Sequence, residues 1–179
     1  MSYSQSVEVI INDHDVDVVA RNAILLLIAL VVEDMDEAVE CIIHVWYSAL
    51  IRKSDLDILQ IKIRPLVKGV CDSKMFEGES INKLVAADWQ FEQRSLRLVL
   101  EKTSWDRLLS LLDTPEGLTA AGAQQIRQAV TLANSRKDWR DRYLLLQRRA
   151  HQVPMNRFRE EGILLPFGSQ RKGFQEPNP

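Results

Sequence analysis

The feature that most constrains this chain is one long apolar run, VDVVARNAILLLIALVV, at residues 16–32. From Val18 onward its polar residues are Arg21 and Asn22. A helix that is apolar on nearly every face is buried on both sides. The uninterrupted part is about half of the roughly 20 residues that a membrane span needs. The sequence therefore predicts a buried core helix over residues 16–32, with Leu26 and Leu30 almost fully enclosed.

The residues that precede this helix indicate a strand and an acidic turn. Residues 7–11, VEVII, are β-branched and partly alternating, which is typical of a strand. In a nucleoside-binding sheet, a carboxylate after the second strand accepts two hydrogen bonds from ribose hydroxyls. Asp13 and Asp15 are therefore the candidate cofactor-binding residues. Helix capping by the same acids is the alternative, which we favour because a lone acid matches the nucleoside fingerprint weakly.

Periodicity along the rest of the chain predicts a helix-rich α/β protein. Pro65 lies inside one of the expected helices and should kink or split it. Residues 1–150 are expected to form the domain, and residues 151–179, rich in Gly, Pro and Arg, an extended segment of it. The expected helices are residues 35–52, 56–71, 104–112, 119–132 and 138–149, with a strand at 95–100 and a loop with a short helix around Trp89 at 72–93.

Composition and charge indicate a soluble, cytoplasmic protein. The chain is 46% apolar and 27% charged, as globular proteins are. Its two cysteines make no disulfide framework, which favours a reducing compartment. Residues 1–89 hold 8 Lys/Arg against 15 Asp/Glu, a net −7, and residues 90–179 hold 15 against 10, a net +5. Either the two halves attract each other, which we favour, or they face different partners.

Neither a metal site nor a catalytic site is expected. Cys41 and His44 share one helix face and could form a zinc site with Cys71 and His14. Structural zinc sites usually show two close ligand pairs, and this sequence has one, so core packing is the favoured interpretation. No motif places a serine or cysteine nucleophile beside a base. We therefore predict no metal, no cofactor and no catalytic residue.

A basic stretch near the end interleaves arginines with Trp139, Tyr143 and Phe158. Arginines combined with aromatic rings can bind RNA or single strands. Acidic residues interrupt the stretch, however, and a pI near 6.0 differs from the basic footprint of nucleic-acid proteins. We expect a solvated helix face, or docking onto the acidic first half, rather than a nucleic-acid site.

Several segments resemble one known family: NDHDVDVVARNAILLLIAL, HVWYSAL, RSLRLVL, LTAAGAQQIRQAVTLA, RKDWRDR and, most specifically, RFREEGILLPFGSQRKGFQEPNP. The family is the fungal domain of unknown function 4470, often joined to a MYND-type zinc finger, and it also covers the N-terminal region of axonemal dynein assembly factor 3. The resemblance implies a degenerate or truncated Rossmann-like, methyltransferase-type domain. Longer members carry a strand and a GCGD-type turn before the segment that opens this chain, so the first βα unit is expected to be missing here.

Two functions follow as expectations. The first is a non-catalytic protein-interaction or assembly-factor module, because catalytic motifs are missing and an assembly factor is among the relatives. The alternative is an S-adenosylmethionine-dependent methyltransferase, or a fragment of one, with Asp13 as the ribose ligand. The expected partner is another protein, or the missing N-terminal part of the same protein, and not a membrane. Self-association is also expected, because a strand at residues 7–11 would leave an unpaired edge.

Overall fold

The computed structural model describes residues 8–73, 83–165 and 172–179, leaving aside the side chain of Arg140. The protein is a helix-rich α/β structure, as the sequence predicts. None of the described helices is long and apolar enough to cross a membrane. In chain order, the elements are α1 (Val16–Val31), α2 (Met35–Tyr47), β1 (Leu50–Arg52), α3 (Lys53–Asp57), the π-helical segment η1 (Ile58–Ile63), α4 (Arg64–Cys71), β2 (Leu84–Phe91), β3 (Arg94–Glu101), α5 (Lys102–Ser110), α6 (Ala120–Thr131), the 3-10 turn η3 (Asn134–Arg136), α7 (Lys137–Leu145), α8 (Arg149–Glu161) and β4 (Phe174–Pro177).

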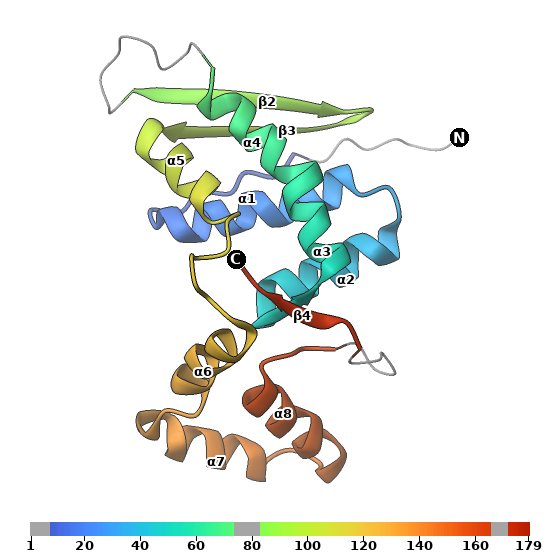
Figure 1. The fold of residues 1–179 in the computed structure, drawn as a ribbon, viewed down its shortest axis with the longest axis vertical. Coiled ribbons are helices and arrows are strands. Elements are labelled where there is room, and N and C mark those ends of the chain that lie inside the picture. The colour runs from blue at the N-terminus through green and yellow to red at the C-terminus, as the bar shows by residue number, and fades with distance from the viewer. Residues whose placement is uncertain (1–7, 74–82, 166–171) are drawn as a thin grey trace.

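The strands form two separate antiparallel pairs, β1 with β4 and β2 with β3. A Rossmann-like domain is built on a mostly parallel sheet, and the described residues form no parallel pair. Figure 1 shows β2 and β3 above α1, the β1–β4 pair in the middle of the molecule, and a lobe of α6, α7 and α8 below it. We call these three helices the helical lobe.

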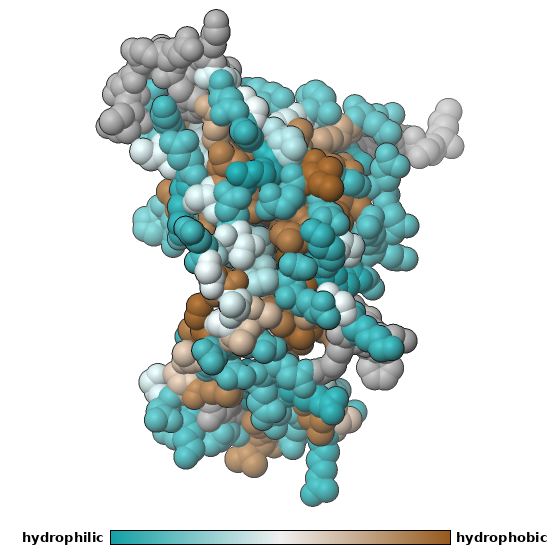
Figure 2. Space-filling view, in the orientation of Figure 1, coloured by the Kyte–Doolittle hydropathy of each residue, from teal (hydrophilic) through white to brown (hydrophobic). Residues whose placement is uncertain are grey.

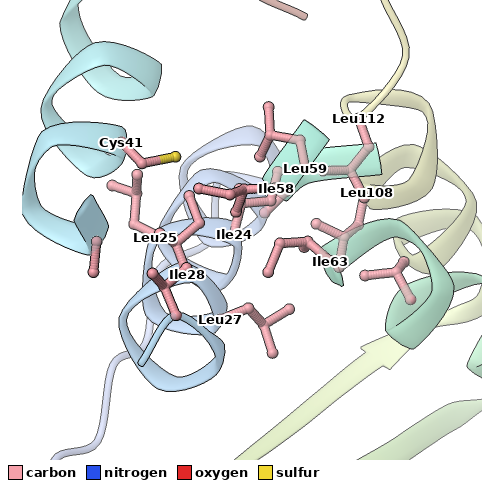
Figure 3. Packing of buried hydrophobic residues seen from close by; sticks show 14 of the residues in the cluster. Ile24, Leu25, Leu27, Ile28, Cys41, Ile58, Leu59, Ile63, Leu108 and Leu112 are labelled. Carbon is pink, nitrogen blue, oxygen red and sulfur yellow. The ribbon is translucent and has the colours of Figure 1, made fainter. Parts of the chain in front are cut away.

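Helix α1 is the centre of the hydrophobic core, as its apolar run predicts. It begins where Asp15 caps it, since an oxygen of that side chain accepts a hydrogen bond from the amide of Asp17 at 2.9 Å. Its side chains meet those of α2, η1 and α5 (Figure 3). Leu27 and Ile28 are fully enclosed.

The prediction that Leu26 and Leu30 are almost fully enclosed was wrong, because both are only half-buried. Leu26 faces a small cavity of about 90 Å³ between α1, β3 and the chain before α1. A helix that is apolar on most faces does not reveal which face its neighbours leave partly open.

The predicted helix at residues 56–71 belongs to a longer helical rod made of α3, η1 and α4. Pro65 lies in the first turn of α4, directly after the π-helical turn. Proline removes a backbone donor and crowds the preceding turn, so a helix that continues past it changes its winding or its direction. Here the winding is π-helical from Ile58 to Ile63 and returns to α-helical at Arg64, in the turn that contains the proline.

The β2–β3 hairpin corrects the expectation of a loop and short helix around Trp89. That residue lies in β2, opposite Leu96 of β3. Its ring meets the ring of Trp105 on α5, with centroids 6.0 Å apart. The indole nitrogen of Trp105 donates to the carbonyl of Val85 at 3.2 Å, which fastens the hairpin to the helix. The strand predicted at residues 95–100 is confirmed as part of β3.

The strand predicted at residues 7–11 was wrong over its described part. Residues 8–11 form no regular structure, and Val9 and Ile10 are 74% and 86% exposed. Position 7 lies outside the described residues. A strand needs a partner to pair its backbone groups, and the described hydrogen bonds give this segment none. The alternating pattern was present, but its pairing partner was not.

The C-terminal part differs from the predicted extended segment, because residues 149–161 form helix α8. Gly162 ends this helix in the left-handed conformation, at φ 70°. The chain then returns to the middle of the molecule, where β4 pairs with β1. Asn178, after β4, donates from its side chain to the carbonyls of Val45 and Ser48 at 2.8 and 2.7 Å. The last residues therefore hold the end of α2 in place.

Candidate functional site

A buried histidine–carboxylate pair lies where α2, β1 and α3 meet. His44, on α2, and Asp55, on α3, are 1% and 0% exposed. The Nδ1 atom of His44 is 3.0 Å from an Oδ2 oxygen of Asp55. Such a pair is the positioning half of many hydrolytic sites, so its surroundings decide whether it can act on a substrate.

Arg52, at the end of β1, saturates the carboxylate of Asp55. Its Nη2 atom donates to Oδ1 at 3.0 Å, and its backbone amide donates to Oδ2 at 2.9 Å. Its Nη1 atom donates to Glu40 at 2.7 Å. Burial raises the pKa of Asp55, but the hydrogen bonds from His44 and Arg52 outweigh it and hold that pKa below its ordinary value.

The burial and negative charge around Asp55 also make the thiol of Cys41 unreactive. Burial, reinforced by the negative charge of Asp55, raises the pKa of Cys41 to about 12. A thiol in this state is not a nucleophile at neutral pH, because the thiolate is the reactive form.

The enclosure of this pair identifies it as structural. The Nε2 atom of His44 is buried without a described hydrogen-bond partner, and the ring packs edge-on against Phe174 of β4 at 4.7 Å. Neither His44 nor Asp55 lines a described cavity. The pair therefore joins α2, β1 and α3 and has no described path to a substrate. Sequence reasoning missed it, because its partners are eleven residues apart on different elements.

The four residues considered for zinc lie in different places. Cys41 and His44 are in the core, whereas His14 is fully exposed before α1. Cys71, at the end of α4, points its Sγ atom at the carbonyl of Trp105, 3.7 Å away. Among the described residues, no cluster of three or more His, Cys, Asp or Glu side chains could hold a metal ion.

Asp13 and Asp15 form an exposed capping turn. An oxygen of Asp13 accepts from the amide of Asp15 at 3.0 Å, a bond that lowers the pKa of Asp13. Asp15 in turn caps α1. Neither carboxylate lines a described cavity. Asp17, which the sequence did not single out as a ligand, lines one of about 200 Å³ and is paired with Arg107 at 2.7 Å.

The helical lobe exposes several large aromatic and aliphatic side chains to solvent. No described side chain of helix α7 is fully buried. Trp139 is 72% exposed and stacks on Tyr143, with ring centroids 5.7 Å apart. Leu145 and Leu146 are each 82% exposed. Figure 2 shows apolar side chains gathered among polar ones at this end of the molecule. We call the exposed face of α7 and α8 the α7–α8 surface.

A cavity of about 560 Å³ opens on this surface. Apolar and cationic side chains line it together, and no acidic side chain is among them. A nitrogen of Arg159, Nη1, is enclosed without a hydrogen-bond partner. The guanidinium of Arg127 lies over the Phe158 ring, 5.0 Å from its centre, in a cation–π contact. The lining residues are Thr131, Ser135, Arg136, Trp139, Met155, Phe158 and Arg159.

Charge separates the helical lobe from the rest of the protein. Residues 119–162 contain nine Lys/Arg and four Asp/Glu, a net +5, whereas residues 8–73 contain six and twelve, a net −6. Arg107 of α5 pairs with Asp17 of α1 across the two halves. The described ion pairs do not join α7 or α8 to the acidic first half.

Fold and surface together define a helix-rich α/β protein with a basic, aromatic helical lobe. Residues 1–51 match the family model described as Domain of unknown function (DUF4470), which is the family that the sequence motifs resemble. The match covers α1, α2 and the start of β1 and stops before the helical lobe. No curated protein and no solved structure matches the chain.

Proposed function

We propose that this chain is a non-catalytic protein-interaction module of the assembly-factor type, and that the α7–α8 surface is its contact. The observation that carries the proposal is the exposure of α7. A short helix draws most of its stability from packing an apolar face against other elements. Helix α7 leaves Trp139, Leu145 and Leu146 in solvent instead, so a partner that covers them would both bind and stabilise the helix.

The kinds of side chain on this surface support a protein partner. Tryptophan, tyrosine, methionine and arginine are enriched in the cores of protein interfaces, where a few of them supply most of the binding energy. Trp139, Tyr143, Met155 and Arg159 bring all four kinds to one surface. We also propose a cytoplasmic location, which the two free cysteines support.

The methyltransferase remains the alternative hypothesis, and it depends on the resemblance of the first residues to a Rossmann-like family. Its proposed ribose ligand, Asp13, is hydrogen-bonded within its own turn, which supports the capping role instead. We therefore rank the interaction module first.

Proximity labelling in the cells that express the protein tests the proposal. The double variant Leu145→Ser/Leu146→Ser removes apolar surface from the end of α7. The matched control is Ile61→Ser, an equally apolar residue that is 70% exposed on η1. We expect a defined set of partners to be lost in the double variant and kept in the control, with unchanged thermal stability in both. Identical partner sets in the wild type and the double variant would contradict the proposal.

A further inference from the structure

We propose that the cavity of the α7–α8 surface receives an acidic segment of the partner protein. A large apolar side chain of that segment enters the cavity, and neighbouring carboxylates pair with Arg136 and Arg159. This inference rests on the proposed function and specifies the chemistry of the partner.

The size and lining of the cavity indicate an apolar anchor. Its volume, about 560 Å³, lies within the range of pockets that enclose small ligands. Trp139, Met155 and Phe158 supply apolar walls from α7 and α8. Aromatic anchors that fill such pockets dominate the affinity of protein interfaces. A phenylalanine or leucine side chain would fit both the walls and the space.

The cationic groups indicate carboxylates beside that anchor. Arg136 and Arg159 line the cavity, and no acidic side chain lines it with them. The enclosed Nη1 atom of Arg159 lacks an acceptor, and an unsatisfied buried donor is unfavourable. A carboxylate is the acceptor that a guanidinium binds best, through two parallel hydrogen bonds. The net charge of +5 on the lobe would also attract an acidic segment from a distance.

A protein segment fits this surface better than a nucleic acid. Leu145 and Leu146, at the end of α7, and Val153 of α8 are 82%, 82% and 61% exposed. Aliphatic side chains have no partner on a phosphate backbone, whereas the core of a protein interface is rich in apolar contacts. Interfaces with nucleic acid are polar and strongly basic. Here two acids, Asp138 and Asp141, interrupt the basic residues of α7.

Fluorescence anisotropy with synthetic peptides tests the inference. The probe is a short labelled peptide with one phenylalanine among aspartates and glutamates. Three comparison probes are the same peptide with serine in place of phenylalanine, the same peptide with lysines in place of the acids, and a single-stranded oligonucleotide of equal charge. We expect the acidic phenylalanine peptide to bind at least about tenfold more tightly than each of these, a difference of about 1.4 kcal/mol. Its binding should weaken as salt is raised.

Variants connect this binding to the cavity. Trp139→Ala removes an apolar wall and Arg159→Gln removes the unpaired cation, and each should weaken binding of the peptide about tenfold. Arg136→Gln serves as a second charge variant if Arg159→Gln does not fold. The control is Arg97→Gln. The side chain of Arg97 is 69% exposed, and β3, which carries it, lies outside the lobe. This variant should bind the peptide as the wild type does.

Several results would overturn the inference. Equal binding of the lysine peptide would exclude recognition of charge, and equal binding of the serine peptide would exclude the anchor. Tighter binding of the oligonucleotide would make the surface a nucleic-acid site. The protein could instead associate with itself, in a way that Trp139→Ala abolishes and the peptide does not compete with. That result would identify a second copy of the chain as the occupant of the cavity. If cellular partners are lost in Leu145→Ser/Leu146→Ser while the peptides show no preference, the inference fails and the proposed function stands.

Discussion

Asp55 is the buried residue on which the junction of α2, β1 and α3 depends. It is fully enclosed and accepts hydrogen bonds from His44 and Arg52. Removing one partner of a buried ion pair costs about 3–5 kcal/mol. We expect Asp55→Asn to lower the free energy of unfolding by about 3 kcal/mol, the lower end, because Arg52 keeps its bond to Glu40. Urea titration measures the loss.

The control for this substitution is Asp57→Asn, whose pair with Lys53 lies at the surface. Exposed pairs contribute little, so the midpoint of unfolding should hardly move. Equal losses in the two variants would show that burial of Asp55 does not govern its contribution.

The same carboxylate makes stability depend on pH. Its pKa is lower in the folded protein than in the unfolded chain. The stabilisation is therefore complete above the unfolded pKa, near 4, and is lost as the pH falls through the folded pKa. We expect the free energy of unfolding to drop between about pH 4 and more acidic values, and Asp55→Asn to reduce this slope. Parallel pH profiles for wild type and variant would contradict this assignment.

Gly162 marks a second position where one residue type is required. Its φ of 70° is left-handed, and a Cβ there would lie 3.0 Å from the Cβ of Ala49 and 3.1 Å from Cγ of Arg127. The left-handed conformation alone costs an L-residue about 1–2 kcal/mol. We expect Gly162→Ala to destabilise the protein by about 2 kcal/mol or more, measured by thermal unfolding.

Gly69 provides the matched control, because it lies in helix α4 with open space around its Cα. Alanine is preferred to glycine inside a helix by about 0.5–1 kcal/mol. Gly69→Ala should therefore leave stability unchanged or raise it. A loss there as large as that at Gly162 would show that backbone conformation is not the cause.

At the scale of elements, α1 contributes more buried side chains to the core than any other described element, and its faces are unequal. Leu27 is fully enclosed within the main hydrophobic cluster, whereas Leu30 is half-buried. Leu27→Ala should cost about 2–5 kcal/mol, through lost burial and the cavity left behind. Leu30→Ala should cost about 1 kcal/mol. Denaturant midpoints compare the two, and a larger loss at Leu30 would reverse the assignment of the faces.

At the scale of the whole molecule, the described residues form an acidic turn at Asp13 and Asp15. They form no enclosed pocket around this turn that could hold a nucleoside. Asp13 can offer a ribose only an exposed carboxylate. Micromolar binding needs roughly 8 kcal/mol, which two solvent-exposed hydrogen bonds do not supply. We expect calorimetry to detect no binding of S-adenosylmethionine or NAD. Micromolar binding that Asp13→Ala abolishes would promote the methyltransferase hypothesis.

The sequence by itself determined the elements whose signals are local. The apolar run made α1 a core helix, and Asp15 and Thr119 were available to cap α1 and α6. These features depend on side chains within one or two helical turns of each other, so the local sequence is enough to predict them. The basic, aromatic composition around Trp139 was visible in the same way.

Tertiary structure decided everything that depends on distant partners. Strand β1 exists because β4, from the far end of the chain, pairs with it, whereas residues 8–11 have a strand-like pattern and no described pairing partner. The junction at Asp55 requires His44 and Arg52 from other elements. Likewise, the sequence showed arginines and aromatic residues, but only packing shows that α7 has no fully buried side chain among those described and that a cavity opens beside it. Backbone pairing and burial are properties of neighbours in space, and a local pattern does not specify those neighbours.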